Sequence, residues 1–540
     1  MRIFKPIKNF FKSKKIIDDY CLFNKRLFNK LLSNKKKGEI LVEFNAFQPF
    51  HIGASIMSNL LANKFSAKIN SYVGFTLLVS PLKYTYINIL KWKIGNYFNL
   101  KTFKIYRSFN IANIFYPKID KQIELEAKII VKKFLKKIKT KDDILKLKIK
   151  KIPIGDLLYD TYLKKDVIPT INLNDQKFHI YTEDYIKLTL FWIKYFKLNN
   201  VKAVMGSHSV YSYGIPLRIA AYNNISAYVL AAEDCYKVTK KKLYHLSDSA
   251  DYKKIINNLS KEKIKEGKNL AKQKLKNKFR GKTGHMAMDN VILRNSSFKK
   301  NMQKNLIKKS KKIKILICAH EFNDAVHIYG KNFFSDMYEW LEFLGKLSNQ
   351  NKYDWYIKTH TTQPGKYKIY QPADVNILKK IIKKYENIKM LPSNYSHLQI
   401  IKEKIDVVLT VYGSVTFEYP FFNIPVITAS KNVPNKLYKF SIIPKSKKDY
   451  KKKLHRLDRI NYKKNEDEIL EYYFARFIYN DSRNWLFDFE SLLKTFRTWD
   501  RIFHFNLYKY YTNNFNMHNF EKKKKLFLDF INSKEYRIRT

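Results

Sequence analysis

The stretch that most constrains this fold is residues 405–434, IDVVLTVYGSVTFEYPFFNIPVITASKNVP, which has the pattern of strand, turn, helix and strand. Residues 406–411 are a short apolar run rich in β-branched side chains, as expected for a strand buried on both faces. Gly413 allows a sharp turn, and Ser414 is a good cap for a helix that begins at Val415. The stretch therefore predicts a strand–helix–strand unit in a parallel sheet.

The same turn predicts an anion site. A helix that begins after Ser414 presents free N–H groups and a positive dipole end. Ligands of open α/β sheets bind at the carboxyl ends of the strands, where this turn lies. We expect a nucleotide phosphate on Gly413 and Ser414, with Glu418 facing the same crevice one helical turn later. The alternative is an ordinary strand–helix–strand unit in which Ser414 only caps its helix.

Strand, loop and helix patterns recur in both halves of the chain, whose 540 residues are more than one core normally serves. We expect two Rossmann-like α/β domains facing each other across a cleft, an N-terminal domain at residues 38–300 and a C-terminal domain at residues 312–445. A basic amphipathic extension precedes them at residues 1–37. A basic, aromatic and helical extension follows them at residues 446–540.

The charge of the chain is strongly unbalanced, with 105 Lys and Arg against 46 Asp and Glu, a formal net charge of +59. Such an excess attracts nucleic acid, anionic lipid headgroups and phosphorylated substrates. Drift in an AT-rich genome is an equal explanation, because Lys, Ile, Asn, Phe and Tyr are all abundant. Nucleic acid is the weaker choice of partner, since the lysines are spread along the whole chain and no recognised nucleic-acid module is present. Residues 1–37 suit an anionic membrane surface, or a helix packed on the body with its lysines outward.

Cysteine usage and hydropathy indicate the compartment. Cys21, Cys235 and Cys318 are far apart and show no CxxC spacing, which disfavours a disulfide framework or a zinc site and favours a reducing cytoplasm. No window approaches the roughly 20 apolar residues of a membrane span. We expect a cytoplasmic protein that is soluble or peripheral on the inner face of the cytoplasmic membrane.

Several segments resemble bacterial surface-carbohydrate and capsule biosynthesis proteins. Residues 320–330, HEFNDAVHIYG, carry part of this resemblance together with residues 333–336 and Trp340. Residues 358–360, KTH, are similar to the Lys-Pro-His-Pro motif of capsule-type Kdo transferases and related sialyltransferases, except that threonines replace both prolines. Residues 412–418, YGSVTFE, resemble the Ser-rich phosphate turn and following Glu of the same proteins.

The resemblance covers about residues 38–445 and implies a glycosyltransferase of GT-B type. Such an enzyme transfers a sugar from a nucleotide-activated donor to a glycan or lipid-linked acceptor. It needs no metal or other cofactor, because cationic side chains and helix dipoles stabilise the leaving phosphates. The resemblance implies that Lys358, His360 and Ser414 hold the donor phosphates and that Glu418 holds a ribose or sugar hydroxyl. The competing interpretations are a loop histidine hydrogen-bonded to the backbone for His360 and an exposed helix carboxylate for Glu418. A non-catalytic assembly subunit with the same fold is the alternative.

The acceptor hydroxyl needs a general base, and His51 is the first candidate. Residues 38–44 form the first expected strand and residues 54–65 the next helix, so His51 is expected in the loop between them. A histidine packed against the neighbouring phenylalanines is the competing interpretation. Asp324 and His327, three residues apart in one loop, are the second candidates.

Two further residues are expected on the acceptor side of the site. His208 follows the strand expected at residues 201–206, and Glu233 follows the strand expected at residues 227–231. Hydrogen bonding within their loops is the competing interpretation. A further strand of this domain is expected at residues 101–106.

Overall fold

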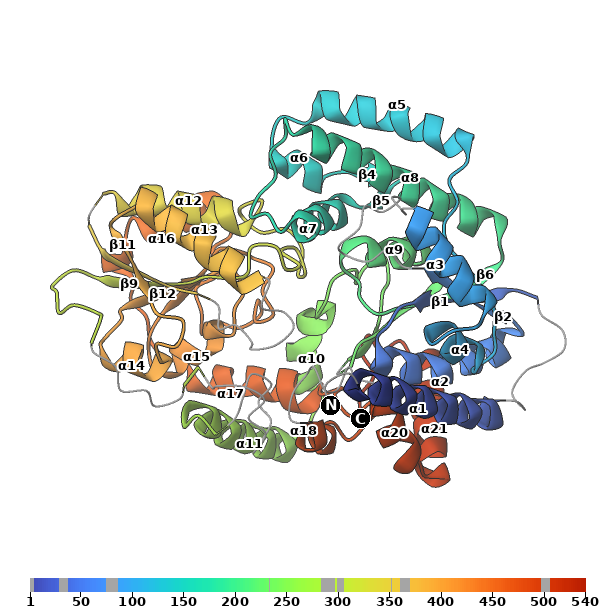
Figure 1. Ribbon diagram of the computed structural model, residues 1–540. Helices are drawn as coiled ribbons and strands as arrows, with labels where there is room; N and C mark the ends of the chain where they lie inside the picture. Colours follow the sequence, from blue (N-terminus) through green and yellow to red (C-terminus); the bar gives the residue numbers. More distant parts are fainter. Residues whose placement is uncertain are drawn as a thin grey trace. The chain divides into compact units, whose positions relative to one another are not determined.

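The computed structural model describes residues 4–28, 37–73, 86–232, 234–282, 297–298, 305–350, 352–359, 370–496 and 506–540. The chain divides into two compact units (Figure 1). The first unit consists of Met1–Lys165, Leu173–Tyr244 and Ser482–Thr540, and the second of Asp166–Asn172 and His245–Asp481. The division after Tyr244 departs from the boundary that we expected near residue 300, and the expected C-terminal extension is shared between the units.

The first unit is built on a six-stranded sheet with the order β3-β2-β1-β6-β7-β8. The strands are β1 (Glu39–Phe44), β2 (Lys68–Val73), β3 (Ile111–Phe115), β6 (Val201–Gly206), β7 (Ser226–Leu230) and β8 (Cys235–Lys237). All neighbours pair in parallel except β7 and β8. Ile40, Leu41 and Val42 of β1 are fully buried, as the β-branched, apolar pattern requires.

The helices of the first unit are α1 (Phe4–Phe28), α2 (Gln48–Phe65), α3 (Tyr86–Tyr97), α4 (Thr102–Arg107), α5 (Lys121–Lys137), α6 (Lys141–Leu145), α7 (Gly155–Asp166), α8 (Gln176–Leu198), α9 (Gly214–Tyr222), α18 (Phe489–Phe496), α20 (Asn506–Asn513) and α21 (Met517–Asn532), beside a short hairpin of β4 (Lys148–Ile149) and β5 (Ile152–Pro153). The strand expected at residues 101–106 is wrong, because this segment is helix α4. Its alternating pattern also fits a helix that buries Phe103 and Tyr106 three residues apart, and the third strand begins later, at Ile111.

Both ends of the first unit pack on its body. Tyr20 of α1 stacks on Tyr508 of α20, with ring centroids 4.3 Å apart. The backbone near Arg537 pairs with the edge strand β8, because Lys237 N–H donates to the Tyr536 carbonyl and Ile538 N–H donates to the Cys235 carbonyl. These bonds satisfy backbone groups that an open sheet edge would leave exposed.

The second unit is built on a five-stranded, wholly parallel sheet with the order β11-β10-β9-β12-β13. The strands are β9 (Lys314–Cys318), β10 (Asp354–Lys358), β11 (Ile388–Leu391), β12 (Val407–Thr410) and β13 (Val426–Thr428). The helices are α10 (Tyr252–Asn257), α11 (Lys261–Phe279), α12 (Met337–Ser348), α13 (Tyr370–Lys384), α14 (His397–Lys402), α15 (Val415–Phe421), α16 (Lys447–Leu454) and α17 (Glu466–Phe474), the last continued by a π-helical turn at Ala475–Tyr479.

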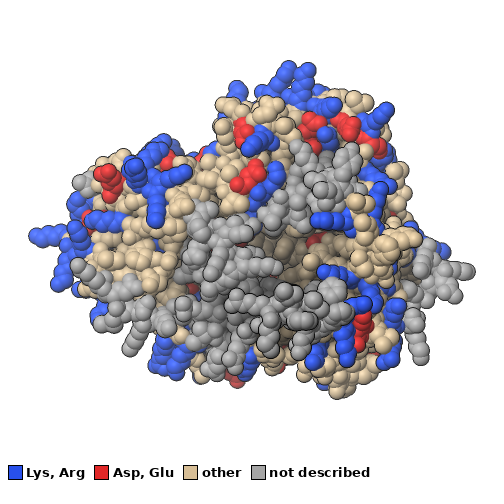
Figure 2. Space-filling model, viewed as in Figure 1, with Lys and Arg blue, Asp and Glu red and all other residues tan. Residues whose placement is uncertain are grey.

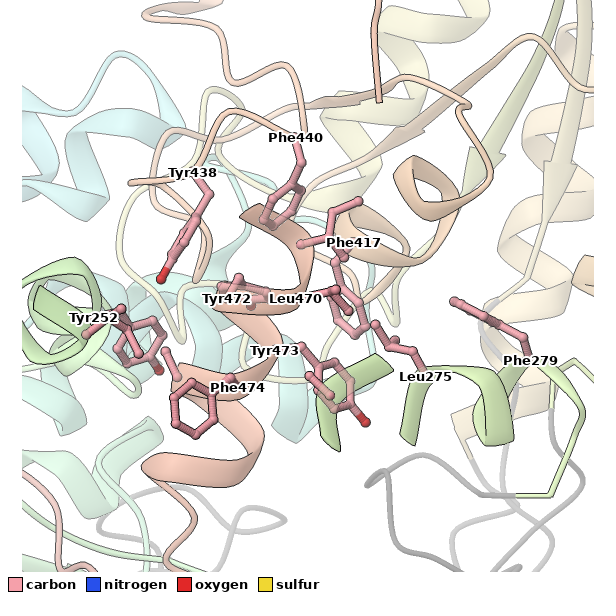
Figure 3. Packing of buried hydrophobic residues seen from close by; sticks show 14 of the residues in the cluster. Tyr252, Leu275, Phe279, Phe417, Tyr438, Phe440, Leu470, Tyr472, Tyr473 and Phe474 are labelled. Carbon is pink, nitrogen blue, oxygen red and sulfur yellow. The ribbon is translucent and has the colours of Figure 1, made fainter. Parts of the chain in front are cut away.

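An aromatic core joins α11, α15 and α17 in the second unit. Figure 3 shows Phe417 of α15 beside Tyr472 and Tyr473 of α17, at centroid distances of 5.8 and 5.9 Å. Gly267 makes the close approach of α11 possible, since a Cβ at this position would lie 2.4 Å from the Phe474 ring. This packing fixes where the π-helical turn lies relative to α15.

Both sheets therefore have the strand order of doubly wound nucleotide-binding folds. The order reverses between β1 and β6 in the first sheet and between β9 and β12 in the second. The expected fold class, two Rossmann-like α/β units with helical extensions, is confirmed. That the two face each other across a cleft stays a prediction. No helix in the described ranges combines the length and apolar character that crossing a membrane requires.

Candidate functional site

The strand order of the second unit reverses between β9 and β12, and the residues that follow these strands meet there. His320 Nε2 lies 2.9 Å from Thr410 Oγ1, at the end of β12. The His320 ring contacts Tyr412 at 4.6 Å between centroids, and Tyr412 contacts Tyr329 edge-on at 5.1 Å. Reversal points of this kind are where α/β sheets bind ligands. An imidazole and two partly exposed phenol rings can stack on a base or sugar and hydrogen-bond to it.

The turn after β12 differs from the expected cap. Ser414 has helical backbone angles and its side chain caps no N–H group, so the cap prediction is wrong. The Ser414 side chain is exposed at the sheet edge instead. The space beside Gly413 is narrow, because a Cβ there would lie 3.0 Å from Thr410 Oγ1 and 3.5 Å from His320 Cε1. The turn therefore lies directly against His320.

Lys358, at the carboxyl end of β10, is a buried cation. Its Nζ donates to the Ser393 carbonyl at 2.7 Å, and the residue is 2% exposed. Burial lowers the pKa of Lys358 to about 8. No carboxylate of the described residues lies within 4.0 Å of Nζ. One strand, β9, separates Lys358 from Thr410, so Lys358 does not touch the turn at Ser414 in this structure.

Glu418 is not open to a substrate. Its carboxylate is buried and forms an ion pair with Lys278 of α11, with Nζ and Oε1 2.6 Å apart. The Lys278 ammonium also lies over the Phe417 ring, 5.3 Å from its centroid. Both the expected sugar-binding role and the alternative of an exposed carboxylate are wrong, because Glu418 joins α15 to α11. Nothing in the local pattern identifies Lys278, which is 140 residues away in sequence.

His397 lies in the same interior as Lys358 and Lys278. Its Nδ1 is 2.7 Å from Tyr419 Oη, and burial together with these two lysines lowers the pKa of His397 well below its ordinary value. The carboxyl side of this sheet thus covers a buried, positively charged interior.

His51 is part of the core of the first unit. The helix expected from residue 54 begins at Gln48, with Pro49 in its first turn, and His51 is 1% exposed. Its Nδ1 contacts Tyr508 Oη and its Nε2 lies 2.9 Å from the Asn45 carbonyl. Burial lowers the pKa of His51 to about 4. With both ring nitrogens engaged, the packed-histidine interpretation fits and the role of general base does not. The proline was the signal for the earlier helix start.

At the reversal point of the first sheet, Glu43 at the end of β1 connects this strand to the loop after β6. Its carboxylate accepts hydrogen bonds from Ser207 N–H at 2.7 Å and from the Asn45 amide at 3.0 Å. Complete burial raises the pKa of Glu43. His208 follows Ser207 and is exposed, with its ring 6.1 Å from that of Tyr213. His208 therefore lies where the sequence placed it, at the carboxyl edge of the first sheet.

The remaining candidates are only partly placed. Asp324 is exposed and His327 is 2% exposed, and their role as second candidates for the general base stays a prediction. His360 and Glu233 lie outside the described residues, and their roles stay predictions. Within the described ranges, no three or more His, Cys, Asp and Glu side chains are grouped as metal ligands.

Basic side chains do not gather into one band on the face seen in Figure 2. Lys and Arg are spread over the described residues of that face and are interspersed with Asp and Glu. A continuous basic stripe, the pattern of a nucleic-acid interface, is not seen on this face of the described residues.

The sequence matches no protein-family model and no curated protein. Similar solved structures include KpsC, a beta Kdo 2,4 transferase from Thermosulfurimonas dismutans, with 9% identity, a TM-score of 0.31 and coverage of 51% of this chain and 79% of that chain. UDP-GlcNAc 2-epimerase from Neisseria meningitidis has 10% identity and a TM-score of 0.21, with coverage of 81% of this chain and 97% of that chain. ADP-heptose lps heptosyltransferase II from E. coli has 10% identity and a TM-score of 0.18, with coverage of 75% of this chain and 89% of that chain. At such TM-scores the matches carry no argument about function, and the fold class rests on the strand order of the two sheets.

Proposed function

We propose that this protein is a metal-independent glycosyltransferase of bacterial surface-polysaccharide synthesis, of capsule or lipopolysaccharide type. It transfers a sugar from a nucleotide-activated donor to a glycan or lipid-linked acceptor. The donor lies at the carboxyl edge of the second sheet, and the acceptor lies near His208 at the carboxyl edge of the first.

The observation that carries this proposal is the reversal point between β9 and β12, where His320, Tyr412 and the exposed Ser414 come together. A nucleotide there would stack on the aromatic rings, with Ser414 and Gly413 beside its phosphates. Lys358, buried at the carboxyl end of β10, adds positive electrostatic potential to this edge of the sheet. Donor cleavage leaves negative charge on the phosphates, and a fixed cation near a low-dielectric interior stabilises that charge.

The test is a thermal-shift screen with CMP, UDP, GDP and their sugars, followed by product analysis with the sugars that bind. A ligand at 100 times its Kd stabilises the folded state by about 2.7 kcal/mol and so raises the melting temperature. Transfer to a glycan or lipid acceptor supports the proposal. If no nucleotide raises the melting temperature, the proposal is wrong. If nucleotides bind but the sugar is only epimerised, the protein uses sugar nucleotides without being a transferase.

A lipid-linked acceptor requires the protein to reach a membrane. We propose that the basic surface draws it to the anionic face of the cytoplasmic membrane without insertion. In α1, Ile16, Ile17, Tyr20 and Cys21 are buried against the body of the first unit, so this part of the helix contributes its lysines rather than its apolar face.

A further inference from the structure

The inference concerns Arg476, on the π-helical turn that continues α17. Asn480 N–H donates to the Ala475 carbonyl five residues earlier, at 3.1 Å, which is the hydrogen bond of a π-turn. Such turns are rare and occur frequently at functional sites. Arg476 lies one turn beyond Tyr472 on the inward face of the helix, where the pattern of α17 otherwise places aromatic and aliphatic side chains.

The surroundings of Arg476 are aromatic rather than acidic. Its guanidinium carbon lies 4.7 Å from the centroid of the Phe477 ring and 5.9 Å from that of Tyr472. In the part of the chain that the structure describes, its only hydrogen bond goes from Nη1 to Tyr472 Oη, at 2.6 Å. An arginine has five N–H donors, so this bond leaves most of the fork unused. Arg476 as a whole residue is partly exposed, unlike the buried Arg218 and Arg537.

Two other arginines of the chain show what a structural role looks like. Arg218 forms two bonds to the Asp156 carboxylate, at 2.6 and 2.5 Å, and Arg537 lies 2.6 Å from an Asp234 oxygen. Each of these buried cations has its carboxylate, as burial of charge requires. Arg476 has none within 4.0 Å among the described residues. A guanidinium held between rings without a carboxylate is suited to an anionic ligand, and its planar fork matches phosphate.

Arg476 also lies close to the site at the reversal point. Tyr329 and Tyr252 are near enough to interact electrostatically with its guanidinium. Tyr329 contacts Tyr412, which in turn contacts His320. On the other side, Phe477 packs on Phe417 of α15, the helix that follows Ser414. Arg476 is thus connected to the turn after β12 through one layer of aromatic rings.

We propose that Arg476 binds the diphosphate of a nucleotide ligand at the carboxyl edge of the second sheet. This inference rests on the proposed function and deepens it, since it names the cation that contacts the ligand. The hydrogen bond to Tyr472 and the ring of Phe477 hold the guanidinium in place, so little conformational freedom is lost on binding.

The experiment compares the wild-type chain with Arg476→Gln, Arg476→Lys and the control Arg459→Gln, an exposed arginine of the same unit. Dissociation constants are measured by calorimetry for UDP, for uridine and for inorganic pyrophosphate, and melting temperatures are measured without ligand. Losing a hydrogen bond to a charged group costs roughly 1.5–3 kcal/mol, which is about a 10- to 150-fold weaker Kd. Arg476→Gln should show this loss for UDP and pyrophosphate but not for uridine. Arg476→Lys, which keeps the charge without the fork, should lose less, and Arg459→Gln should lose nothing.

The outcomes separate the two proposals. If the wild type binds UDP and Arg476→Gln binds it equally well, the role of Arg476 is overturned while the proposed function stands. If Arg476→Gln and Arg476→Lys lower the melting temperature alike and leave every Kd unchanged, the arginine is structural and the inference is again overturned. If the wild type binds pyrophosphate through Arg476 but binds none of CMP, UDP and GDP, the anion site is supported and the proposed function fails.

Discussion

Replacing Lys358 by methionine should make the protein more stable at neutral pH. An ordinary lysine has a pKa of 10.5, and burial lowers that of Lys358 to about 8. A lowering of this size corresponds to about 3 kcal/mol of free energy, since each tenfold change in an equilibrium constant is about 1.4 kcal/mol. Below pH 8 the folded chain carries this charge with no carboxylate of the described residues within 4.0 Å, and the cost of about 3 kcal/mol is fully present. Methionine has a similar length and no charge, so the gain approaches 3 kcal/mol, less the lost bond to the Ser393 carbonyl.

The gain should depend on pH with a definite sign. Between pH 8 and pH 10.5 the unfolded chain still holds the proton that folded Lys358 has released, so the stability of the wild type rises with pH in this window. The stability difference between Lys358→Met and the wild type should therefore shrink from about 3 kcal/mol at pH 7 toward zero near pH 10.5.

Urea denaturation at pH 7 and at pH 10 measures this difference, with Lys389→Met on the neighbouring strand as the control. Lys389 is exposed and should show no gain at either pH. A Lys358→Met variant that is less stable than the wild type at pH 7, or whose difference is the same at both pH values, refutes the reasoning. The same variant should bind nucleotide more weakly, because a cation kept at the expense of stability is expected to serve a ligand.

Three more outcomes follow from the structure. Glu418→Gln leaves Lys278 buried without its carboxylate and should cost roughly 3–5 kcal/mol of unfolding free energy, whereas Glu418→Leu combined with Lys278→Met should restore most of it; a cost under about 1 kcal/mol would show that the pair is not buried. His51→Ala should lower the free energy of unfolding by about 3 kcal/mol without changing the Kd for nucleotide. Because the pKa of His51 is lowered to about 4, the wild type should lose stability as the pH falls from 6.5 toward 4, whereas the variant should not. Denaturation at pH 5 and pH 7 would show this difference. The protein should sediment with anionic vesicles at low salt and leave them at high salt, and its staying in solution at low salt would exclude membrane recruitment by charge.

The strands were the most predictable part of the fold. Val201–Gly206 and Val407–Thr410 are buried on both faces, and such strands need the short β-branched runs that the sequence shows. Once the strands are predicted, the positions of their carboxyl ends are known, and so Ser414 and His208 were placed correctly at their sheet edges. Helix starts were less predictable where a proline was overlooked, as at Gln48.

The parts that could not be predicted depend on contacts between distant residues. Glu418 has the same local pattern whether it faces solvent or Lys278, and only the packing of α11 on α15 and α17 decides between these surroundings. The π-helical turn that presents Arg476 has no simple signature, because it is an irregularity of one residue in a continuous helix. His320 could have been found, since it stands directly after a buried strand at the point where the strand order reverses.

The division of the chain between the two units has a consequence for synthesis. The first unit needs Ser482–Thr540, because this segment packs Trp485 against Gly53 and pairs its backbone with β8. The ribosome makes this segment after all of the second unit. The second unit is complete once Asp481 has emerged, so it can fold while the first sheet still lacks its cover. During that interval the growing chain exposes the edge of β8 and the apolar side of α2. We expect a chain released at residue 481 to aggregate through these surfaces, with its second unit still protected from proteolysis.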